Sequence, residues 1–169
     1  VLYPCIAIGP PADTNQLDAM IHTSTQFDWL ILTSTNTVQM LKQRMDALAV
    51  EAAWSGVQVA AVGPKTAKLA ERLLRVRVDC VPDEHTAEAL AGILPLIPDA
   101  KVALPQSELA NNTLMQCLSD SGADVSGVVA YRNVIGQGGD DVSGPIHGLT
   151  FTSGSTVRNF ITRWSDEGR

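Results

Sequence analysis

Short apolar runs alternate with amphipathic stretches along most of the chain. The runs are rich in Val, Ile, Leu and Ala, and each ends at a turn residue such as Pro, Gly, Ser or Asp. This pattern predicts β-strands at 2–9, 27–32, 57–62, 76–81, 101–105 and 123–134, with a further strand from 148. Between the strands, apolar residues recur every three or four positions behind capping residues. This spacing predicts α-helices that begin near 14, 35, 64, 87, 109 and 154.

The alternation of strands and helices between 14 and 122 indicates the fold class. It predicts an α/β domain in which a parallel sheet carries helices on both faces. The strands at 2–9 and 128–135 bracket this domain, and we expect them to pair as an antiparallel, two-stranded ladder that joins it to a neighbour. Residues 135–145 are rich in Gly and Asp, which is typical of a linker.

The neighbouring domain is represented only by the residues from 148 onward, which predict one strand and one helix. A unit this small cannot bury a core of its own. We therefore expect a complete α/β domain at 8–130, connecting strands and a linker at 1–7 and 131–147, and a fragment of a second, similar but incompletely represented α/β domain at 148–169.

One strand-to-helix turn occurs twice. The first turn of a helix leaves backbone N–H groups unpaired and carries partial positive charge, so it favours carboxylate or phosphate oxygens. In parallel sheets ligands bind outside the carboxyl ends of the strands, where both turns would lie. The candidate anion-binding residues are Thr33, Ser34 and Thr35 in the first copy and Ser153, Gly154, Ser155 and Thr156 in the second. Alternatively, these residues only cap their helices.

A different turn, Gly63-Pro64-Lys65-Thr66, follows the strand at 57–62. Pro64 suits the first helical position, where a missing N–H costs nothing. Gly63 would let a ligand or another backbone come close. If the strands are parallel, Thr66 points its hydroxyl toward the same rim as Ser34. A tight β-α turn without a ligand is the alternative.

Composition narrows the class of protein. A chain of 169 residues with 45% hydrophobic and few aromatic residues is typical of a soluble α/β protein with a real core. No apolar run reaches the length of a membrane span, and residues 1–4 lack the basic start of a signal peptide. The net charge of −6 argues against nucleic acid as a partner. An acidic ligand would have to be held by backbone amides and a few local cations.

Several kinds of site are missing from the sequence. The three cysteines are scattered, which fits neither a disulfide framework nor a metal site and favours a cytoplasmic location. His22, His85 and His147 are isolated, so we expect no metal. No dinucleotide or P-loop motif occurs, so we expect no cofactor. The Ser and Thr residues at the strand ends lack an evident base, which argues against covalent catalysis.

Several short stretches match one known family, in the family's order, over nearly the whole chain. They are 28–34 (DWLILTS), 62–67 (VGPKTA), 81–82 with 86–90 (VP and TAEAL), 104–105 (LP), 131–133 (YRN) and 151–157 (FTSGSTV). Taken together, these stretches resemble the uroporphyrinogen-III synthase family, whose members are cofactor-free enzymes of tetrapyrrole synthesis. Gln106 departs from the pattern, because relatives often place a basic residue there.

The resemblance implies two α/β domains joined by a two-stranded ladder, with the active site in the cleft between them. It also implies that the opening and closing elements of one domain are not in this sequence. In the family, hydroxymethylbilane loses its hydroxyl, ring D is inverted through a spiro intermediate, and the macrocycle closes as uroporphyrinogen III. This linear tetrapyrrole carries many carboxylates, which suits amide-rich strand ends.

The resemblance also assigns roles to individual residues. Tyr131 is similar to the tyrosine proposed to assist departure of the hydroxyl, and Thr66 is similar to a threonine of the cleft. Ser34, Ser153 and Ser155 match the turns that hold the substrate. The alternative for Tyr131 is a strand tyrosine that packs its ring at the domain junction and leaves its hydroxyl in water.

Two other functions stay open at this point. The chain could be a non-catalytic module that binds a carboxylated metabolite with the two strand-end turns. It could also be one section of a fused tetrapyrrole enzyme. For the enzyme we expect a monomer that binds its small-molecule substrate and neither nucleic acid nor a membrane.

Overall fold

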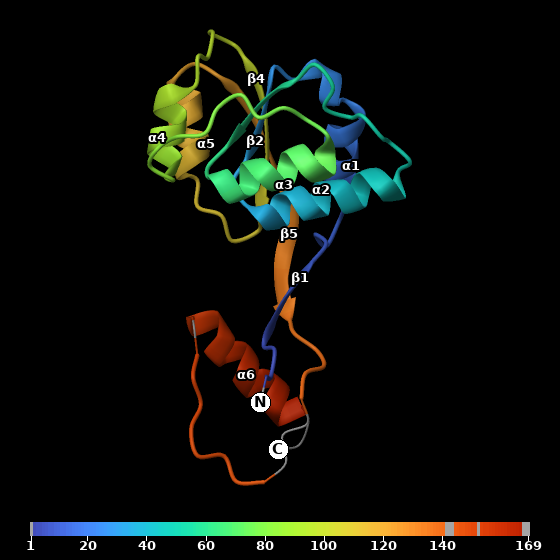
Figure 1. Ribbon diagram of the computed structural model, residues 1–169, viewed down its shortest axis with the longest axis vertical. Helices are drawn as coiled ribbons and strands as arrows, with labels where there is room; N and C mark the ends of the chain where they lie inside the picture. The colour runs from blue at the N-terminus through green and yellow to red at the C-terminus, as the bar shows by residue number, and fades with distance from the viewer. Residues whose placement is uncertain (1, 141–143, 152, 167–169) are drawn as a thin grey trace. The chain divides into compact units, whose positions relative to one another are not determined.

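The computed structural model describes residues 2–140, 144–151 and 153–166 (Figure 1). The chain divides into two compact units. The larger unit comprises residues 10–132, and the smaller unit comprises residues 1–9 together with 133–169. Each unit is described by itself below.

The larger unit is built on a parallel sheet, as the alternation of elements predicts. Its strands are β2 (Trp29–Leu32), β3 (Gln58–Ala61), β4 (Lys101–Ser107) and β5 (Asp124–Ile135), which begins in the larger unit and ends in the smaller one. They lie in the order β5-β4-β2-β3, and every pair runs parallel. All four residues of β2 are buried, which is the expected pattern for a strand that is covered on both faces.

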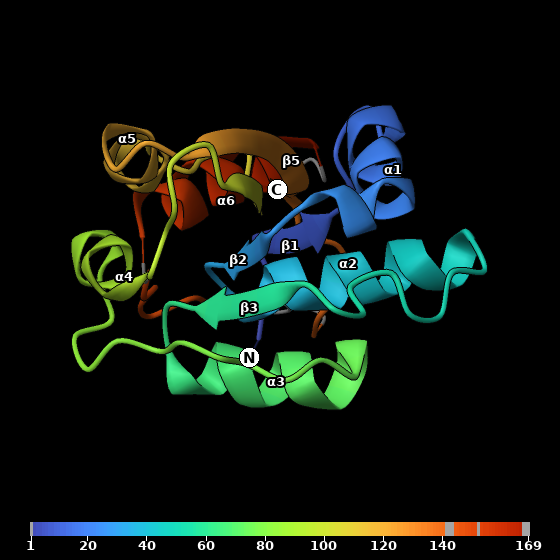
Figure 2. The same ribbon diagram turned by 90° about the horizontal axis from the view of Figure 1, so that it is seen from above.

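Helices cover both faces of this sheet, which confirms the predicted layers (Figure 2). The helices α1 (Asn15–His22), α2 (Thr35–Ala47) and α3 (Pro64–Leu74) pack on one face, where they meet Leu30 and Leu32. The helices α4 (Ala87–Ile93) and α5 (Thr113–Asp120) pack on the other face against Trp29 and Ile31. Successive residues of β2 thus supply the two cores in alternation, as the pleat of a strand requires. A short 3₁₀ helix, Ser24–Gln26, precedes β2.

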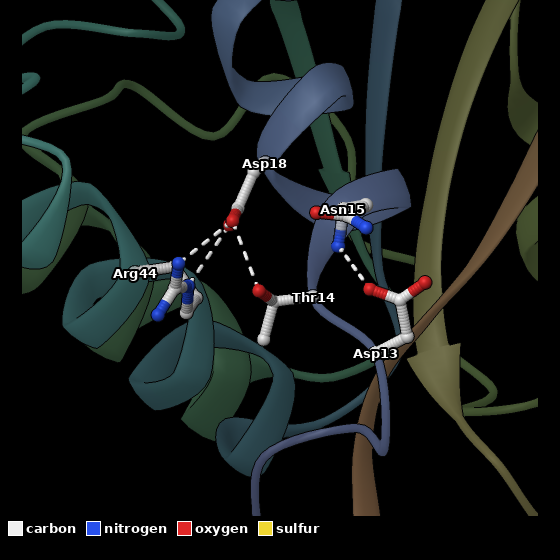
Figure 3. A network of polar contacts seen from close by, with 5 residues as sticks. All are labelled: Asp13, Thr14, Asn15, Asp18 and Arg44. Atoms are coloured by element: carbon white, nitrogen blue, oxygen red, sulfur yellow. Dashed lines mark hydrogen bonds and ion pairs between the residues drawn. The ribbon is translucent and has the colours of Figure 1, made fainter.

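An ion pair ties α1 to α2 (Figure 3). Arg44 donates from Nε to Oδ1 of Asp18 at 2.9 Å and from Nη2 to Oδ2 at 2.7 Å. Thr14 donates its hydroxyl to the same carboxylate at 3.0 Å. The guanidinium of Arg44, acting first through its hydrogen bonds, holds the pKa of Asp18 below its ordinary value. The pair therefore stabilises the packing of the two helices when Asp18 is ionised.

The predicted strand at 76–81 is wrong. This segment runs beside the edge of β3 but forms only one bridge, between Ala60 and Cys80, among the described residues. The physical reason is Asp79, whose carboxylate accepts the N–H of Val59 at 3.0 Å. A side chain thus takes the hydrogen bond that a backbone carbonyl would take in a regular ladder, so strand pairing does not extend.

The helix that was expected from Leu109 begins later, at Thr113. Leu109 lies outside it and is 65% exposed. Strand β4 continues to Ser107, and side-chain oxygens then hold the turn. Ser107 Oγ accepts the N–H of Leu109, and Asn111 Oδ1 accepts the N–H of Thr113. Such local hydrogen bonds compete with helix formation.

The smaller unit contains β1 (Ile6–Gly9), the end of β5 and helix α6 (Gly154–Asp166). Strand β1 is shorter than the predicted 2–9 and lies next to β5 in the sheet order. The two segments run in opposite directions, since Gly9 lies against Val134, Gly136 against Pro4, and Asp140 donates its N–H to the carbonyl of Leu2.

Helix α6 is held by aromatic and polar contacts within the smaller unit. Phe160 and Trp164 pack on Tyr3, with ring centroids 5.8 Å from it in each case. The guanidinium of Arg163 lies over the Tyr3 ring at 3.8 Å and donates to the carbonyls of Pro4 and Gly138. These contacts satisfy the charge of an arginine that is only 7% exposed.

The strand expected from 148 is wrong for the described residues 148–151, which form no strand; Thr152 lies outside the described residues. A strand exists only through hydrogen bonds to a neighbouring strand, and no described segment of the smaller unit pairs with 148–151. The likeness of the smaller unit to the larger one, and the boundaries at 8–130 and 148–169, stay predictions. No helix in the described ranges is long and apolar enough to cross a membrane.

The Asp18–Arg44 pair predicts a pH-dependent stability. The variant Asp18→Asn should lose about 1 kcal/mol of unfolding free energy at pH 7, because it keeps the shape but not the charge of the carboxylate. A depressed folded-state pKa gives stability above the unfolded value, near 3.8, that is lost as the pH falls below it. Urea unfolding at pH 7 and pH 3 should therefore show a gap between wild type and variant that shrinks at the lower pH.

Asp46→Asn is the matched control, since Asp46 pairs with Lys42 on the exposed surface of the same helix α2. It should change the unfolding free energy by less than about 0.5 kcal/mol. An equal loss in both variants, or a gap that does not change with pH, would contradict the assignment.

Candidate active site

The candidate site lies at one edge of the larger unit's sheet. Because β2, β3 and β4 are parallel, their carboxyl ends and the turns after them share this edge. We call these turns the carboxyl-end rim and define it as residues 33–37, 62–66 and 106–108 together with Tyr131. Tyr131 belongs to the rim because it pairs with Ser107, the last residue of β4.

Ser34 caps α2, as the sequence pattern predicts. Its backbone is extended, and its Oγ accepts the N–H of Thr37 at 3.1 Å. The N–H groups of Thr35 and Asn36, which begin the helix, have no acceptor within the described residues. This turn therefore offers two free amide donors, at the positive end of a helix of 13 residues.

The hydroxyl of Tyr131 meets the hydroxyl of Ser34 at 3.2 Å. Tyr131 is only 8% exposed, and its ring packs in the core that contains α1, α2 and α3. The Ser34 Oγ also lies 3.0 Å from Thr37 Oγ1, and Thr37 is fully buried. The ring of Tyr131 is thus packed in this core, and its hydroxyl is hydrogen-bonded to Ser34. The role of Tyr131 in a reaction stays a prediction.

A β-bulge places Tyr131 on this side of the sheet. The register between β4 and β5 shifts at Gln106 and Ser107, so that Gln106 pairs with Val129 and Ser107 with Tyr131. In a regular strand Ala130 and Tyr131 would face opposite sides, yet both pack into the same core. The extra residue turns the tyrosine toward α2 and Ser34.

The turn after β3 has the predicted geometry. Gly63 is the N-cap of α3, Pro64 occupies the first helical position, and Ala67 donates its N–H to the Gly63 carbonyl at 3.0 Å. Thr66 is 6% exposed, and its hydroxyl has no hydrogen-bond partner within the described residues. Strand β3 is parallel to β2, which puts this turn at the same edge as Ser34.

His85 is a rim neighbour that was not among the predicted site residues. Its ring lies against Gly63, with Cγ 3.6 Å from the position that a Cβ on that glycine would take. The side chain is exposed. No local pattern marks this contact, because it arises where the loop before α4 folds back over the end of β3. Thr37 is a second missed residue, although it occupies the motif position that Thr156 occupies in the other copy.

Thr33 belongs to another part of the rim. It lines an open hollow of about 260 Å³ on the side of α4 and α5, together with Val62, Gln106 and Asn111. The site residues of the larger unit are therefore not all together: Ser34 and Tyr131 are in contact, Thr35 begins α2 beside them, and Thr33 faces the other layer.

The second copy of the turn lies in the smaller unit and caps α6. Ser153 Oγ accepts the N–H of Thr156 at 3.3 Å, and Thr156 Oγ1 accepts the N–H of Ser153 at 3.0 Å. This reciprocal pair is a capping box. Ser155 Oγ accepts a hydrogen bond from Arg158 at 3.3 Å. Ser153, Ser155 and Thr156 are thus engaged locally, and the amide of Gly154 begins the helix.

No group of His, Cys, Asp and Glu that could hold a metal ion occurs within the described ranges. The chemistry of the rim is mainly that of hydroxyl and amide donors, with one buried phenol, the ammonium group of Lys65 and the carboxylate of Glu108. Such groups bind oxyanions and can pass a proton.

Comparisons with known proteins agree with one another. Residues 1–169 match the family described as uroporphyrinogen-III synthase HemD. A uroporphyrinogen-III synthase from Synechococcus elongatus is 34% identical over 167 residues, which cover 93% of this chain and 62% of the relative. A porphyrin biosynthesis protein HemD from Ruminiclostridium josui is 27% identical over 98% of this chain and 34% of its own length. The chain thus spans about three fifths of the length of the Synechococcus relative.

Solved structures of uroporphyrinogen III synthases share the fold. The wild-type protein from Thermus thermophilus matches with a TM-score of 0.59 and 22% identity, over 80% of this chain and 53% of that one. The protein from Helicobacter pylori matches with a TM-score of 0.57 and 17% identity, over 94% of this chain and 69% of that one. With a family match over its whole length, this chain belongs to the uroporphyrinogen-III synthase family.

Proposed function

We propose that this chain carries the catalytic rim of a uroporphyrinogen-III synthase, which closes hydroxymethylbilane to uroporphyrinogen III with inversion of ring D. The observation that supports it best is the phenol of Tyr131, fixed 3.2 Å from Ser34 Oγ at the carboxyl ends of a parallel sheet. An O–H donor on a ring packed in the core, at the edge where such folds bind ligands, is suited to protonating a leaving group.

The reaction begins at the hydroxymethyl carbon of the linear tetrapyrrole. Its C–O bond breaks, the electron pair stays with oxygen, and Tyr131 supplies the proton with which the hydroxyl leaves as water. The substituted carbon of ring D then attacks to form the spiro intermediate, and rearrangement inverts the ring. Loss of a proton from the ring carbon at closure restores the aromatic pyrrole and balances the proton that Tyr131 gave.

The rim also supplies donors for the carboxylates of the substrate. The amides of Thr35 and Asn36 are free, and the hydroxyl of Thr66 has no competing partner within the described residues. Because the chain carries a net charge of −6, attraction at long range is absent and these local donors must do the binding. Lys65 on the turn after β3 and His85 against Gly63 add positive or N–H donor groups at the same edge.

The remaining members of the predicted site take supporting roles in this proposal. Gly63 begins the turn into α3 beside His85, and Thr33 faces the open hollow next to Gln106. In the smaller unit, Gly154 offers an amide at the start of α6, while Ser153, Ser155 and Thr156 shape that turn. We propose this turn as a second carboxylate-binding position, a monomer as the working form, and no cofactor.

The activity is tested by incubating the purified protein with hydroxymethylbilane and separating the product isomers after oxidation to porphyrins. We expect type III product in proportion to the protein added. Formation of only the isomer in which ring D is not inverted would contradict the proposal. Saturable binding without turnover would instead identify a ligand-binding module.

Tyr131→Phe tests the proton donor. It keeps the ring in its core and removes only the hydroxyl, so kcat should fall about 10²-fold or more, as expected on loss of a general acid. KM should stay within about twofold of wild type, because the phenol acts in the transition state rather than in substrate binding. Steady-state kinetics with hydroxymethylbilane give both numbers.

Tyr3→Phe is the matched control, since the chain has 2 tyrosines and Tyr3 belongs to the smaller unit. It should leave kcat near wild type once the folded fraction is accounted for. Equal turnover by Tyr131→Phe and wild type would remove this tyrosine from the mechanism.

Thr66→Val tests carboxylate binding at the turn after β3. The change keeps the shape of the side chain and removes a hydroxyl that bonds to nothing in the described structure, so the unfolding free energy should change by less than about 0.5 kcal/mol. KM should rise about tenfold, since a hydrogen bond to a charged group contributes about 1.5 kcal/mol or more. A loss of stability with an unchanged KM would show that Thr66 is only a packing residue.

A further inference from the structure

The contact between Ser34 and Tyr131 belongs to a chain of three hydroxyls whose direction can be worked out. A serine hydroxyl has one proton to donate and two lone pairs that accept. The Oγ of Ser34 meets three partners: the N–H of Thr37 at 3.1 Å, the hydroxyl of Thr37 at 3.0 Å and the hydroxyl of Tyr131 at 3.2 Å. The amide of Thr37 can only donate, so it occupies one lone pair of Ser34.

The two other contacts allow two arrangements. In one, Thr37 donates its hydroxyl proton to Ser34, and Ser34 donates to the oxygen of Tyr131. In the other, Tyr131 donates to Ser34, and Ser34 donates to the oxygen of Thr37. The two arrangements differ in what they leave unpaired: the first leaves the proton of Tyr131 free, and the second leaves the proton of Thr37 free.

Burial decides between the two arrangements. Thr37 is fully buried, and within the described residues its hydroxyl has no hydrogen-bond partner except Ser34. An O–H group left without an acceptor in a core costs about 1–3 kcal/mol. The second arrangement incurs this cost. The first satisfies Thr37, uses both lone pairs and the single proton of Ser34, and leaves free only the proton of Tyr131, whose residue is 8% exposed while Thr37 is 0% exposed.

We infer that Ser34 is a positioning residue that acts through Tyr131. Its hydroxyl accepts from the amide and the hydroxyl of Thr37 and donates to the phenol oxygen, so the Tyr131 proton is available to the substrate's departing hydroxyl. The inference rests on the proposed function of the site. It replaces the expectation that Ser34 itself binds a substrate carboxylate, because its only proton is engaged.

This arrangement also places a hydrogen-bond donor where charge develops in the transition state. A hydrogen bond donated to the phenol oxygen stabilises the negative charge that develops there as the proton leaves. Ser34 stands at the N-terminus of α2, whose partial positive charge acts in the same sense. The two donors on Ser34 polarise its O–H, so the three groups reinforce one another.

Substitutions at Ser34 separate positioning from helix capping. Asp is as good an N-cap as Ser, but a carboxylate cannot donate a proton and would accept the proton of Tyr131 instead. Ser34→Asp should therefore keep wild-type stability and lose kcat about 10- to 100-fold. Ser34→Ala should lose both stability and kcat. Ser34→Thr, which keeps the hydroxyl, should retain kcat within about threefold of wild type.

Two further variants complete the set. Thr86→Ala is the matched control for capping, because Thr86 caps α4 by the same bond, to Ala89 N–H at 3.1 Å, away from any tyrosine. It should lose stability like Ser34→Ala but keep kcat. Thr37→Val keeps the amide and removes the hydroxyl that orients Ser34, so kcat should fall while KM stays constant.

The kinetic outcomes decide the inference when the protein turns over. A fall in kcat for Ser34→Asp at constant KM and constant stability supports it. Wild-type kcat in Ser34→Asp would show that Ser34 is only a cap, and a raised KM with unchanged kcat would show that Ser34 binds the substrate directly. Either result overturns the inference while leaving the proposed function in place.

A double-mutant cycle of unfolding gives a test that does not need activity. Ser34→Ala and Tyr131→Phe should be non-additive, with a coupling of about threefold to tenfold in the unfolding equilibrium constant, as for a hydrogen-bonded pair. Additive effects would overturn the inference. A wild-type protein that does not turn over would overturn the proposed function alone, since this cycle still reports on the Ser34–Tyr131 bond.

Discussion

The register shift between β4 and β5 is the constraint on which the site depends. A strand of regular pleat would turn Tyr131 to the face opposite Ala130, where α4 and α5 pack. The bulge opposite Gln106 and Ser107 puts both residues on the side of α2 instead. Only on that side does the phenol meet the cap of α2. One extra residue in β5 thus determines that the phenol of Tyr131 lies at the sheet edge where α2 begins.

Much of the larger unit could be predicted from the sequence, because its signals are local and strong. The period of the apolar positions identified β2, β3 and β4, and the capping residues Ser34 and Thr86 marked the helices that follow. The parallel order then places the turns after β2 and β3 at one edge, which is why Ser34 and Thr66 could be selected together.

The features that sequence reasoning missed arise from contacts between distant segments. The bulge in β5 depends on pairing with β4, and His85 meets Gly63 only because a loop returns over β3. The segment 76–81 has the composition of a strand, but a single carboxylate, that of Asp79, takes the place of a backbone acceptor. Residues 148–151 have the apolar pattern of a strand without a described neighbour to pair with. The local sequence pattern indicates which secondary structure a segment prefers. Hydrogen bonding to a neighbouring strand decides whether the segment forms a strand.

The two copies of the repeated turn differ in the hydrogen bonds that their serine and threonine side chains make. In α6 the side-chain oxygen of Thr156 accepts the N–H of Ser153, so the two residues of the cap bond to each other. In α2 the corresponding threonine is fully buried beneath the cap, and the serine is shared with a tyrosine. A capping serine becomes part of a reactive site when a third group reaches its oxygen from another strand.

The Asp79 contact at the edge of β3 also affects how molecules of this protein meet one another. An exposed edge strand offers its backbone to any extended chain and so invites intermolecular pairing. Here the N–H of Val59 is taken by a carboxylate, its carbonyl accepts from Asp79 and Cys80, and Ala61 donates to Cys80. These backbone groups of β3 are already hydrogen-bonded, and the charged segment that contains Asp79 lies beside them. The irregular segment that fails to become a strand therefore protects the sheet against aggregation through this edge.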